Sequence, residues 1–585
     1  MSDASQPRRI LAVLLSGVLL LSAVGCGVDV SSTPVDVGDG LGYKDNSRVV
    51  ELPKPVSARA AGLVETFLKA TAGGGGVAAD NAASFFTEKE GKSWRERWKK
   101  AEDQESLTVI RVTNKIEDAG QQGGVLVPVE YQVVGTLTNR GQLEVVKEPA
   151  ATPSRMTFTV VPDSSFGWRI ESIDGNVPDG LFISDVGVSD YYWIDSIYFW
   201  DRTGTHLVPD LRYIPRTVNR NQRATSVVTM LIEGPSAMLG AVQRLRTGTA
   251  ATSVVLSESS DTFEVKLTPN AIAVDNQEDA AKKLLWQLQW SLRFNNNTPT
   301  VNLVAGDFKR TVRADDHTYE NFNDTDDLGS LQTFDIRAEK VVAVDISCKP
   351  VPTQPQVLTT KENKDVVAAA VNREADRIAY VVTTPAGSRQ LTLIRPDRKV
   401  ATSIVAFDLG RPSWIPGTDM LLVTANGNVR AVSGTSGQST VITPSGLGPV
   451  TDLSVSPDGR RIALIAGNRL VVAQLGMDAG KRNISIEPEP QTVPISARLS
   501  AVGVAWSSEE WLKVVGTEGV DSVMYDVTAD GVVARQTELK GFAPQGVVAF
   551  PSPDRPTTES YVLSEQGAYS SGQSESTCVA PFYAL

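Results

Sequence analysis

Residues 450–466 read VTDLSVSPDGRRIALIA, and this stretch decides the fold of the C-terminal part of the chain. Two apolar runs on either side of a Ser-Pro-Asp-Gly segment predict two antiparallel strands joined by a tight turn. Similar units, each a strand, a polar turn and a second apolar strand, recur at 368–382, 412–424, 503–515 and 548–564. The C-terminal part is therefore a repeat region built almost entirely from strands.

The length of the repeat indicates which β architecture it forms. Equivalent apolar positions in the second strands follow one another at intervals of 43, 41, 52 and 48 residues, at Ile378, Leu421, Ile462, Val514 and Val562. An interval of this size holds the four short strands of one propeller blade. We therefore predict an all-β propeller of about five blades over residues 340–585.

The first folded region lies at residues 55–185. Apolar residues recur at helical spacing from Ser57 until the glycines at 73–76 stop the helix, and a second helix follows. Beyond Leu107 the apolar period changes to two, which is typical of half-buried strands. Helices followed by an alternating sheet predict an α+β domain, for which a cone-shaped NTF2-like fold is our hypothesis.

A second α+β domain is predicted at residues 190–316. Its first helix should cover 224–233, because Gly234-Pro235 is a strong stop signal. In its second helix, Trp286 and Trp290 lie four residues apart beside the apolar face. This stripe predicts either a ridge that binds a partner or a wider core face. The polar residues 317–339 are predicted to be a linker, since they lack the Gly and Glu that a calcium-binding loop requires.

The N-terminus predicts export and lipid attachment. Arg8 and Arg9 precede an apolar stretch that ends at Gly25, so residues 1–25 read as a secretory signal peptide. Cys26 follows in the run LLLSAVGCG, which resembles the lipobox of bacterial lipoproteins. Cys26 is then the lipidated residue, and the Gly-, Ser-, Thr- and Pro-rich residues 26–54 form a tether to the folded domains. A plain secretory signal with an incidental cysteine is the alternative.

The two remaining cysteines, Cys348 and Cys578, predict one disulfide. An even number of cysteines in an exported protein favours pairing, with two buried free thiols as the alternative. Cys348 lies near the start of the repeat region and Cys578 seven residues before its end. The first and last strands of a propeller must meet, so ring closure would bring these two residues together.

Composition excludes several classes of function. The net charge of −12 gives no attraction to phosphate backbones, so no nucleic-acid partner is expected. Two histidines in 585 residues, His206 and His317, leave little scope for histidine-based catalysis or metal binding. We predict no cofactor, no metal site and no enzymatic activity. A hydrolase that uses a pair of carboxylates stays open as an alternative, because any two such groups can meet in space.

The order of lipobox, tether, two α+β domains and degenerate propeller resembles the actinobacterial LpqB lipoprotein family. The middle region is similar to a GerMN domain in the segments LVPDLRYIP at 207–215, LIEGP at 231–235 and TFEVKLTP at 262–269. The resemblance implies an accessory protein anchored by lipid on the extracytoplasmic face of the cell membrane. It implies that the protein associates with the extracytoplasmic domain of an MtrB-type sensor histidine kinase. It also implies modulation of MtrA–MtrB signalling, with effects on cell-wall homeostasis and division.

Partner binding is expected through the two α+β domains more than through the rim of the propeller. These domains follow the tether directly, so they lie nearest the membrane, where a sensor domain also projects. The alternative function is a non-catalytic module that binds cell-wall polysaccharide, with Trp286 and Trp290 as stacking residues for the sugar.

Overall fold

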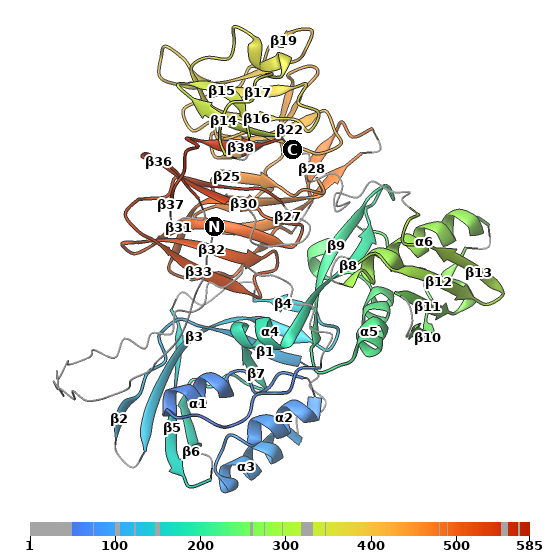
Figure 1. Cartoon of the computed structure of the whole chain (residues 1–585), viewed down its shortest axis with the longest axis vertical. Coiled ribbons are helices and arrows are strands. Elements are labelled where there is room, and N and C mark those ends of the chain that lie inside the picture. Colours follow the sequence, from blue (N-terminus) through green and yellow to red (C-terminus); the bar gives the residue numbers. More distant parts are fainter. Residues whose placement is uncertain are drawn as a thin grey trace, which may run out of the picture. The chain divides into compact units, whose positions relative to one another are not determined.

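The computed structural model describes residues 49–584, except for gaps at 74, 100–105, 122–123, 147–151, 166, 241, 258–260, 274, 295–296, 317–331, 346, 479, 488, 552–559 and 571–573. The predicted signal peptide, Cys26 and most of the predicted tether lie outside the described residues. The described chain forms two α+β domains followed by an all-β region (Figure 1). This arrangement confirms the predicted fold class.

The N-terminal domain places three helices against one mixed sheet. The helices are α1 (Ala60–Phe67), α2 (Gly75–Ala83) and α3 (Glu88–Lys99). The strands are β1 (Ser106–Val112), β2 (Ala119–Gln121), β3 (Val125–Thr138), β4 (Leu143–Val145), β5 (Ser154–Asp163), β6 (Gly167–Gly175) and β7 (Phe182–Ser184). The main sheet order is β6-β5-β3-β1-β7, in which only the pair β1–β7 is parallel.

Aromatic residues join the helices of this domain to its sheet. Phe67 of α1 is 1% exposed, and its ring makes edge-on contacts with Phe86 and Trp94 on the helical side and with Phe158 and Phe182 on the sheet. Edge-on pairs of this kind add to the free energy of burial. Helices and sheet therefore share one core, as an α+β domain requires. The resemblance to an NTF2-like cone stays a prediction.

The middle domain combines a long hairpin, three α-helices and a four-stranded sheet. Its elements are α4 (Asp185–Tyr191), β8 (Tyr192–Trp200), β9 (Leu207–Pro215), α5 (Arg220–Glu233), η1 (Ala237–Leu239), β10 (Ala251–Leu256), β11 (Thr262–Leu267), η2 (Pro269–Ala271), α6 (Gln277–Ser291), β12 (Thr300–Ala305) and β13 (Phe308–Val312). Helix α5 starts four residues before the predicted 224, because Asn219 and Gln222 form a capping box. It stops at Gly234, whose φ of 104° favours glycine.

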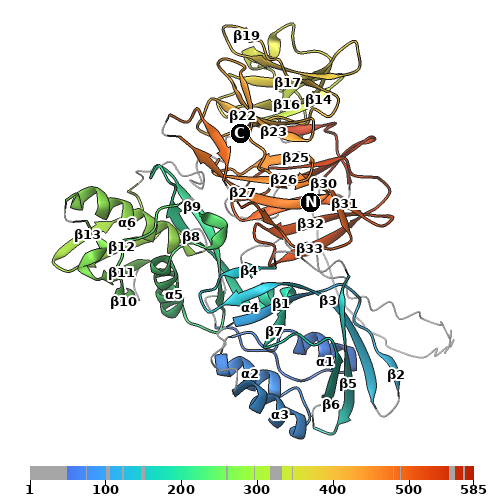
Figure 2. The same cartoon turned by 180° about the vertical axis from the view of Figure 1, so that it is seen from behind.

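The hairpin β8–β9 is buried on both of its faces. Ile197 and Val208 point into the core of the middle domain. On the other face, Leu211 packs in a cluster with strands of the all-β region, and Ile194 packs beside it. Figures 1 and 2 show the hairpin next to strand β27 (Arg469–Met477). A two-stranded hairpin is marginal alone, so packing on two sides is what stabilises it.

The all-β region consists of six sheets among the described residues. Five of them are sequential blades: β16 (Val366–Val371), β17 (Ile378–Thr383), β18 (Arg389–Ile394), β19 (Lys399–Val400) with β20 (Val405–Ala406); β21 (Ser413–Trp414), β22 (Met420–Ala425), β23 (Asn428–Ser433), β24 (Ser439–Val441); β25 (Val450–Val455), β26 (Arg461–Ala466), β27, β28 (Ile484–Ile486) with β29 (Gln491–Thr492); β30 (Leu499–Trp506), β31 (Trp511–Glu518), β32 (Asp521–Thr528), β33 (Ala534–Leu539); and β34 (Gly546–Ala549), β35 (Ser560–Ser564), β36 (Gly567–Ser570), β37 (Ser574–Glu575). We number these blades 2 to 6.

Blade 1 closes the ring from both ends of the region. It pairs β14 (Thr333–Arg337) with β15 (Lys340–Val344) on one side and with the C-terminal strand β38 (Pro581–Tyr583) on the other. The short helix η4 (Gln356–Thr359) follows before blade 2. The propeller therefore has six blades and not about five. The sequence repeat shows only the five blades that are continuous in the chain.

The predicted linker at 317–339 is wrong in its last part. Residues 333–337 form β14, and Phe334 is fully buried in a stack with Phe582 of β38. One pairing partner of β14 is β15, which follows it directly, whereas the other, β38, lies about 250 residues away in the sequence. Residues 317–331 lie outside the described residues.

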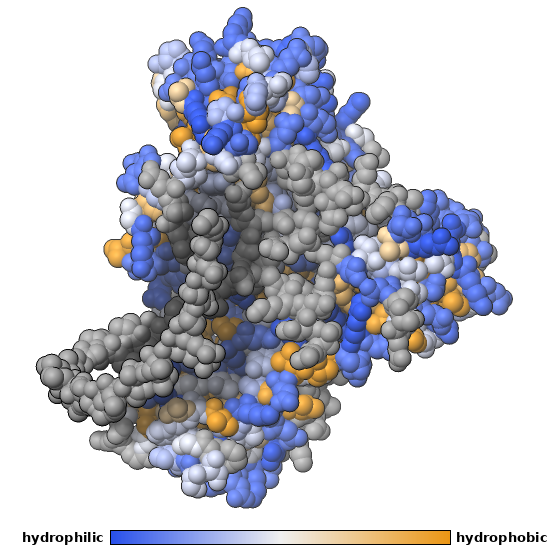
Figure 3. Space-filling view, in the orientation of Figure 1, coloured by the Kyte–Doolittle hydropathy of each residue, from blue (hydrophilic) through white to orange (hydrophobic). Residues whose placement is uncertain are grey.

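The surface is mostly hydrophilic on the face in Figure 3, where apolar residues occur in small groups. Among the described residues, the aromatic side chain of Phe407 is 77% exposed. Within the described ranges, no helix is both long and apolar enough to cross a membrane.

Candidate functional site

Cys348 and Cys578 form a disulfide, with their Cα atoms 5.3 Å apart. Cys348 follows β15 and Cys578 precedes β38, so the bridge ties together the two segments that build blade 1. Asp335 of β14 adds a polar contact at the same place, because its fully buried carboxylate accepts hydrogen bonds from the backbone amides of Val579 and Ala580. The disulfide thus lies at the point where the ring closes.

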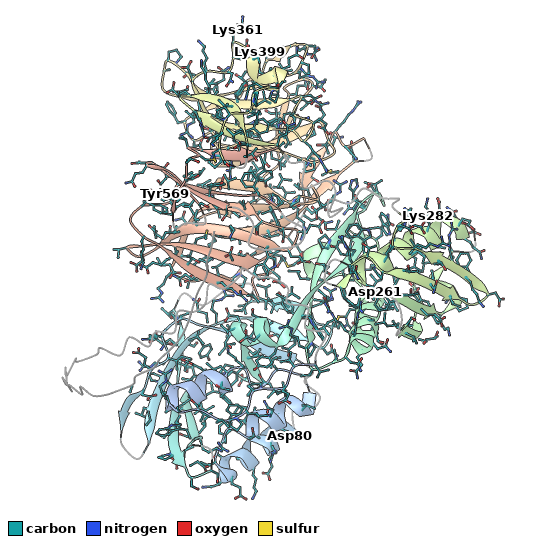
Figure 4. The ribbon with its side chains drawn as sticks, viewed as in Figure 1. Asp80, Asp261, Lys282, Lys361, Lys399 and Tyr569 are labelled. Carbon is teal, nitrogen blue, oxygen red and sulfur yellow. A yellow bond between two sulfur atoms is a disulfide. The ribbon has the colours of Figure 1, made fainter. Side chains whose placement is uncertain are left out.

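The two tryptophans of α6 offer no stacking platform for a sugar. Trp286 is 4% exposed, and the ammonium of Lys282, which Figure 4 labels on this helix, lies 4.7 Å from the centre of its ring. Trp290 is partly buried and packs edge-on against Tyr198 of β8. Both side chains belong to the core of the middle domain. The stripe therefore widens the core face, and the polysaccharide hypothesis loses the residues on which it depended.

Buried charge gathers instead where the three domains meet. One apolar cluster draws residues from all of them: Ala72, Leu107, Val109, Val134, Leu137, Leu143, Ile183, Val188, Tyr192, Tyr213, Trp511, Val532 and Val533. Around it, hydrogen bonds connect the first two domains to turns of blades 4 and 5. We call this region the junction and define it by the hairpin β8–β9, Arg111, Asp185 and the propeller residues 456–461, 494–495 and 507–533.

Arg111 of β1 anchors the N-terminal domain at the junction. Its side chain is 8% exposed, and its Nε donates to Asp185 at 2.7 Å. Its two terminal nitrogens donate to four carbonyl oxygens of the propeller at 2.6–3.2 Å, those of Pro494, Ile495, Gly531 and Val532. A planar guanidinium suits this role because it presents five donors in a fixed fork. Burial raises the pKa of Asp185, whereas the Arg111 charge opposes this shift.

Arg460 joins the middle domain to blade 4. It follows the Pro-Asp-Gly turn directly, and it is 3% exposed. Its Nε donates to Asp201 at 3.0 Å, and its Nη2 lies 2.6 Å from Nδ1 of His206. Burial lowers the pKa of His206 to about 4, and the nearby Arg460 charge adds to this effect. His206 is therefore neutral at pH 7. It supports an interdomain contact and not a catalytic one.

Three hairpin hydroxyls meet three propeller carboxyl groups along the rest of the junction. The Tyr198 hydroxyl donates to Glu509 at 3.1 Å, and the Tyr213 hydroxyl donates to both oxygens of Asp530 at 3.0 Å. The Ser196 hydroxyl donates to Glu510. Burial raises the pKa values of all three acids, that of Glu509 to about 8, with the charge of Asp458 as its second cause.

A pocket of about 260 Å³ lies at the seam between the middle domain and blade 4. Arg202 and Glu487 line it together with the Arg460–Asp201 pair. Arg202 also approaches Glu487 at 3.4 Å, so opposite charges already neutralise one another there. In the described part of the chain, no three His, Cys, Asp or Glu side chains are placed to hold a metal ion. The arrangement supports protein contacts better than chemistry.

The sequence contained a weak signal for this site. The strands β8 and β9 are nearly all buried, and their sequences YWIDSIYFW and LVPDLRYIP place charged residues within apolar runs. A strand buried on both faces loses the alternation that indicates one solvent face. The Pro-Asp-Gly turn joins two strands of blade 4, as its sequence predicts, and it also places Arg460 in the junction.

Family models match each of the three domains in turn. Residues 54–188 match the family model for the N-terminal domain of lipoprotein LpqB, and residues 349–576 match the model for the LpqB β-propeller domain. Residues 196–306 match the Germane family, described as sporulation and spore germination. The β-propeller domain of Cps50 (Swd1) from Myceliophteria thermophila covers 40% of this chain and 90% of its own, with a TM-score of 0.29 and 12% identity.

Relatives share the whole order of domains. Lipoprotein LpqB of Mycolicibacterium smegmatis is 25% identical over 96% of this chain and 94% of its own length. Lipoprotein LpqB of Mycobacterium tuberculosis is 25% identical over 88% and 89%, and that of Rhodococcus opacus is 24% identical over 74% of each. The chain is thus a lipoprotein with an N-terminal α+β domain, a Germane domain and a propeller. It belongs to the LpqB lipoprotein family.

Proposed function

We propose that this protein is a lipid-anchored accessory protein on the extracytoplasmic face of the cell membrane, where it binds the extracytoplasmic domain of an MtrB-type sensor histidine kinase. Through this contact it modulates MtrA–MtrB signalling, cell-wall homeostasis and division. The observation that carries the proposal is the match of all three domains, in order, to LpqB relatives over nearly the whole chain. A shared architecture of this extent favours a shared role.

The protein acts by binding and not by catalysis in this proposal. Its clearest cluster of ionisable groups lies inside the junction, where Arg111 and Arg460 already hold acidic partners. Glu509, whose pKa is raised to about 8, is 3% exposed and lies against Tyr198, so a substrate could not reach it without separating the domains. Perturbed acids can mark active sites, but they also occur in structural networks such as this one.

The lipid anchor gives the first test. Replacing Cys26 by alanine should release the protein from membranes or leave an unprocessed precursor, because the thiol that carries the lipid is gone. Membrane fractionation and incorporation of labelled fatty acid measure this. Replacing Cys348 by alanine is the matched control and should leave labelling unchanged. Continued incorporation of fatty acid into the Cys26→Ala variant would show that the assignment is wrong.

Partner binding gives the second test. The delipidated chain, starting at Gly27, should co-purify with the extracytoplasmic domain of its cognate sensor kinase and not with that of an unrelated kinase. The whole chain is needed, because cutting between the domains would expose the junction. Hydrogen exchange of the complex should then show new protection within residues 55–316. Protection confined to 333–584 would move the contact to the propeller, and absence of co-purification would contradict the proposed function.

A further inference from the structure

The junction contains two kinds of polar contact that respond differently to protons. Ion pairs such as Arg111–Asp185 and Arg460–Asp201 join a charged base to a charged acid. The contacts of Glu510 and Asp530 are of another kind, since no Lys or Arg nitrogen of the described residues lies within 4 Å of either carboxyl group. Their partners across the junction are the neutral hydroxyls of Ser196 and Tyr213.

Glu509 is the third acid that faces the hairpin. Its carboxyl group, 3% exposed, accepts a hydrogen bond from Tyr198. The charges of Asp458 and Glu510 raise its pKa, and the charge of Arg461, which pairs with Asp458 at 3.0 Å, lowers it. A carboxyl group buried among other acids is more stable in its neutral form. Burial and the Asp458 charge accordingly raise the pKa of Glu509 to about 8.

We propose that Glu509, Glu510 and Asp530, with the hairpin hydroxyls that face them, form a proton-sensitive latch that holds the propeller against β8–β9. In the docked state burial favours the protonated forms of these acids, which rest against Tyr198, Ser196 and Tyr213. When the domains separate, water reaches the acids and they ionise at ordinary carboxyl pKa values. Docking therefore takes up protons, and it weakens as the pH rises. This property concerns the chain itself and does not depend on the kinase partner.

The other charged groups around the latch also affect how docking depends on pH. From the hairpin and its loop these groups are Asp195, Asp201, His206, Asp210 and Arg212; from β1 the group is Arg111; and from blades 4 and 5 they are Asp458, Arg460, Arg461 and Lys481. Asp195, Asp201, Asp210 and Asp458 each pair with an arginine. The pKa values of Asp201 and Asp458 are lowered, with arginine charges among the causes, so these two acids stay charged on docking. Arg223 is the partner of Asp195.

The titration of His206 changes the strength of docking in the direction opposite to that of the three acids over part of the pH range. The pKa of His206 falls to about 4 in the docked state, so docking becomes weaker as the pH drops below about 6.5 and His206 has to stay neutral. The Glu509 contribution is complete below the ordinary glutamate pKa of 4.5 and is lost as the pH rises towards about 8. Between pH 6 and pH 8.5, Glu509 and His206 together should weaken docking by about tenfold. Glu510 and Asp530 act in the same direction as Glu509.

A buried reporter can measure this change. Leu211 lies on the propeller-facing side of the hairpin and is 8% exposed, so a cysteine at this position can react only when the junction opens. The test uses the delipidated chain with Leu211→Cys, in which Cys348 and Cys578 remain paired. A thiol reagent is applied at pH 6 and pH 8.5, and the rates are divided by those of the unfolded chain at the same pH. The ratio gives the equilibrium constant for opening.

We expect the equilibrium constant for opening of the junction to rise at least about tenfold from pH 6 to pH 8.5. Glu509→Gln should reduce the rise, and the triple variant Glu509→Gln, Glu510→Gln, Asp530→Asn should abolish it, because amides do not titrate. Glu538→Gln is the matched control: Glu538 is an exposed acid of β33 in the same blade, and the rise should persist. A constant that does not change with pH, or an equal rise in the triple variant, would overturn the proposal.

Discussion

Replacing Arg111 by methionine is expected to lower the free energy that holds the N-terminal domain to the propeller by about 3–5 kcal/mol. The variant keeps most of the apolar side chain but removes five hydrogen bonds, one to Asp185 and four to propeller carbonyls. Asp185, 4% exposed, would then be left as an acid without its base. Differential scanning calorimetry should show one domain unfolding at a lower temperature than in the parent chain.

Two further variants make this result specific. Arg95 pairs with Asp80 on the exposed surface of the same domain, so Arg95→Met should change stability by no more than about 1 kcal/mol. Adding Asp185→Asn to Arg111→Met should recover part of the loss, because it removes the buried acid that lost its partner. Equal effects of Arg111→Met and Arg95→Met would show that the junction contact does not hold the domains together.

Replacing both Cys348 and Cys578 by serine is expected to lower the stability of the propeller by about 2–5 kcal/mol. The bridge closes a separation of 230 residues and joins the two segments of blade 1. Without it, β38 is held by its strand pairing with β14, by the Phe334–Phe582 stack and by the contacts of Asp335. The free energy of unfolding by denaturant measures the loss.

A reducing agent supplies the control for this second experiment. Reduction should destabilise the parent chain by a similar amount and leave the double serine variant unchanged. An unfolding midpoint that is the same in the parent and in the double variant would mean that strand pairing alone closes the ring.

The propeller could be predicted from sequence because its blades are local. Ile378, Leu421, Ile462, Val514 and Val562 all fall in the second strand of a blade, in β17, β22, β26, β31 and β35. Each repeat contains its own hydrophobic pattern, so periodicity reveals it. Blade 1 has only the hairpin β14–β15 in one stretch, because its third strand, β38, lies at the other end of the region. The count of about five was therefore one too low.

The junction could not be predicted, because its contacts join residues far apart in the chain. Arg111 and Val532 are 421 residues apart, and nothing in the sequence around either indicates the other. Buried arginines and acids look like surface charges in a single sequence. The same limit applied to Trp286, whose helical spacing was compatible with a binding ridge as well as with a core face. Only the packing against the hairpin decided between them.

Calorimetric titration of the delipidated chain with the extracytoplasmic domain of its cognate sensor kinase tests the central proposal most directly. We expect saturable binding with a dissociation constant of about 10 µM or lower, as is usual for a specific protein interface. Binding should persist in Glu538→Gln, whose substitution lies outside the proposed contact. If the titration shows no saturable heat of binding at kinase-domain concentrations up to about 1 mM, the result would contradict the proposed role as a kinase accessory protein.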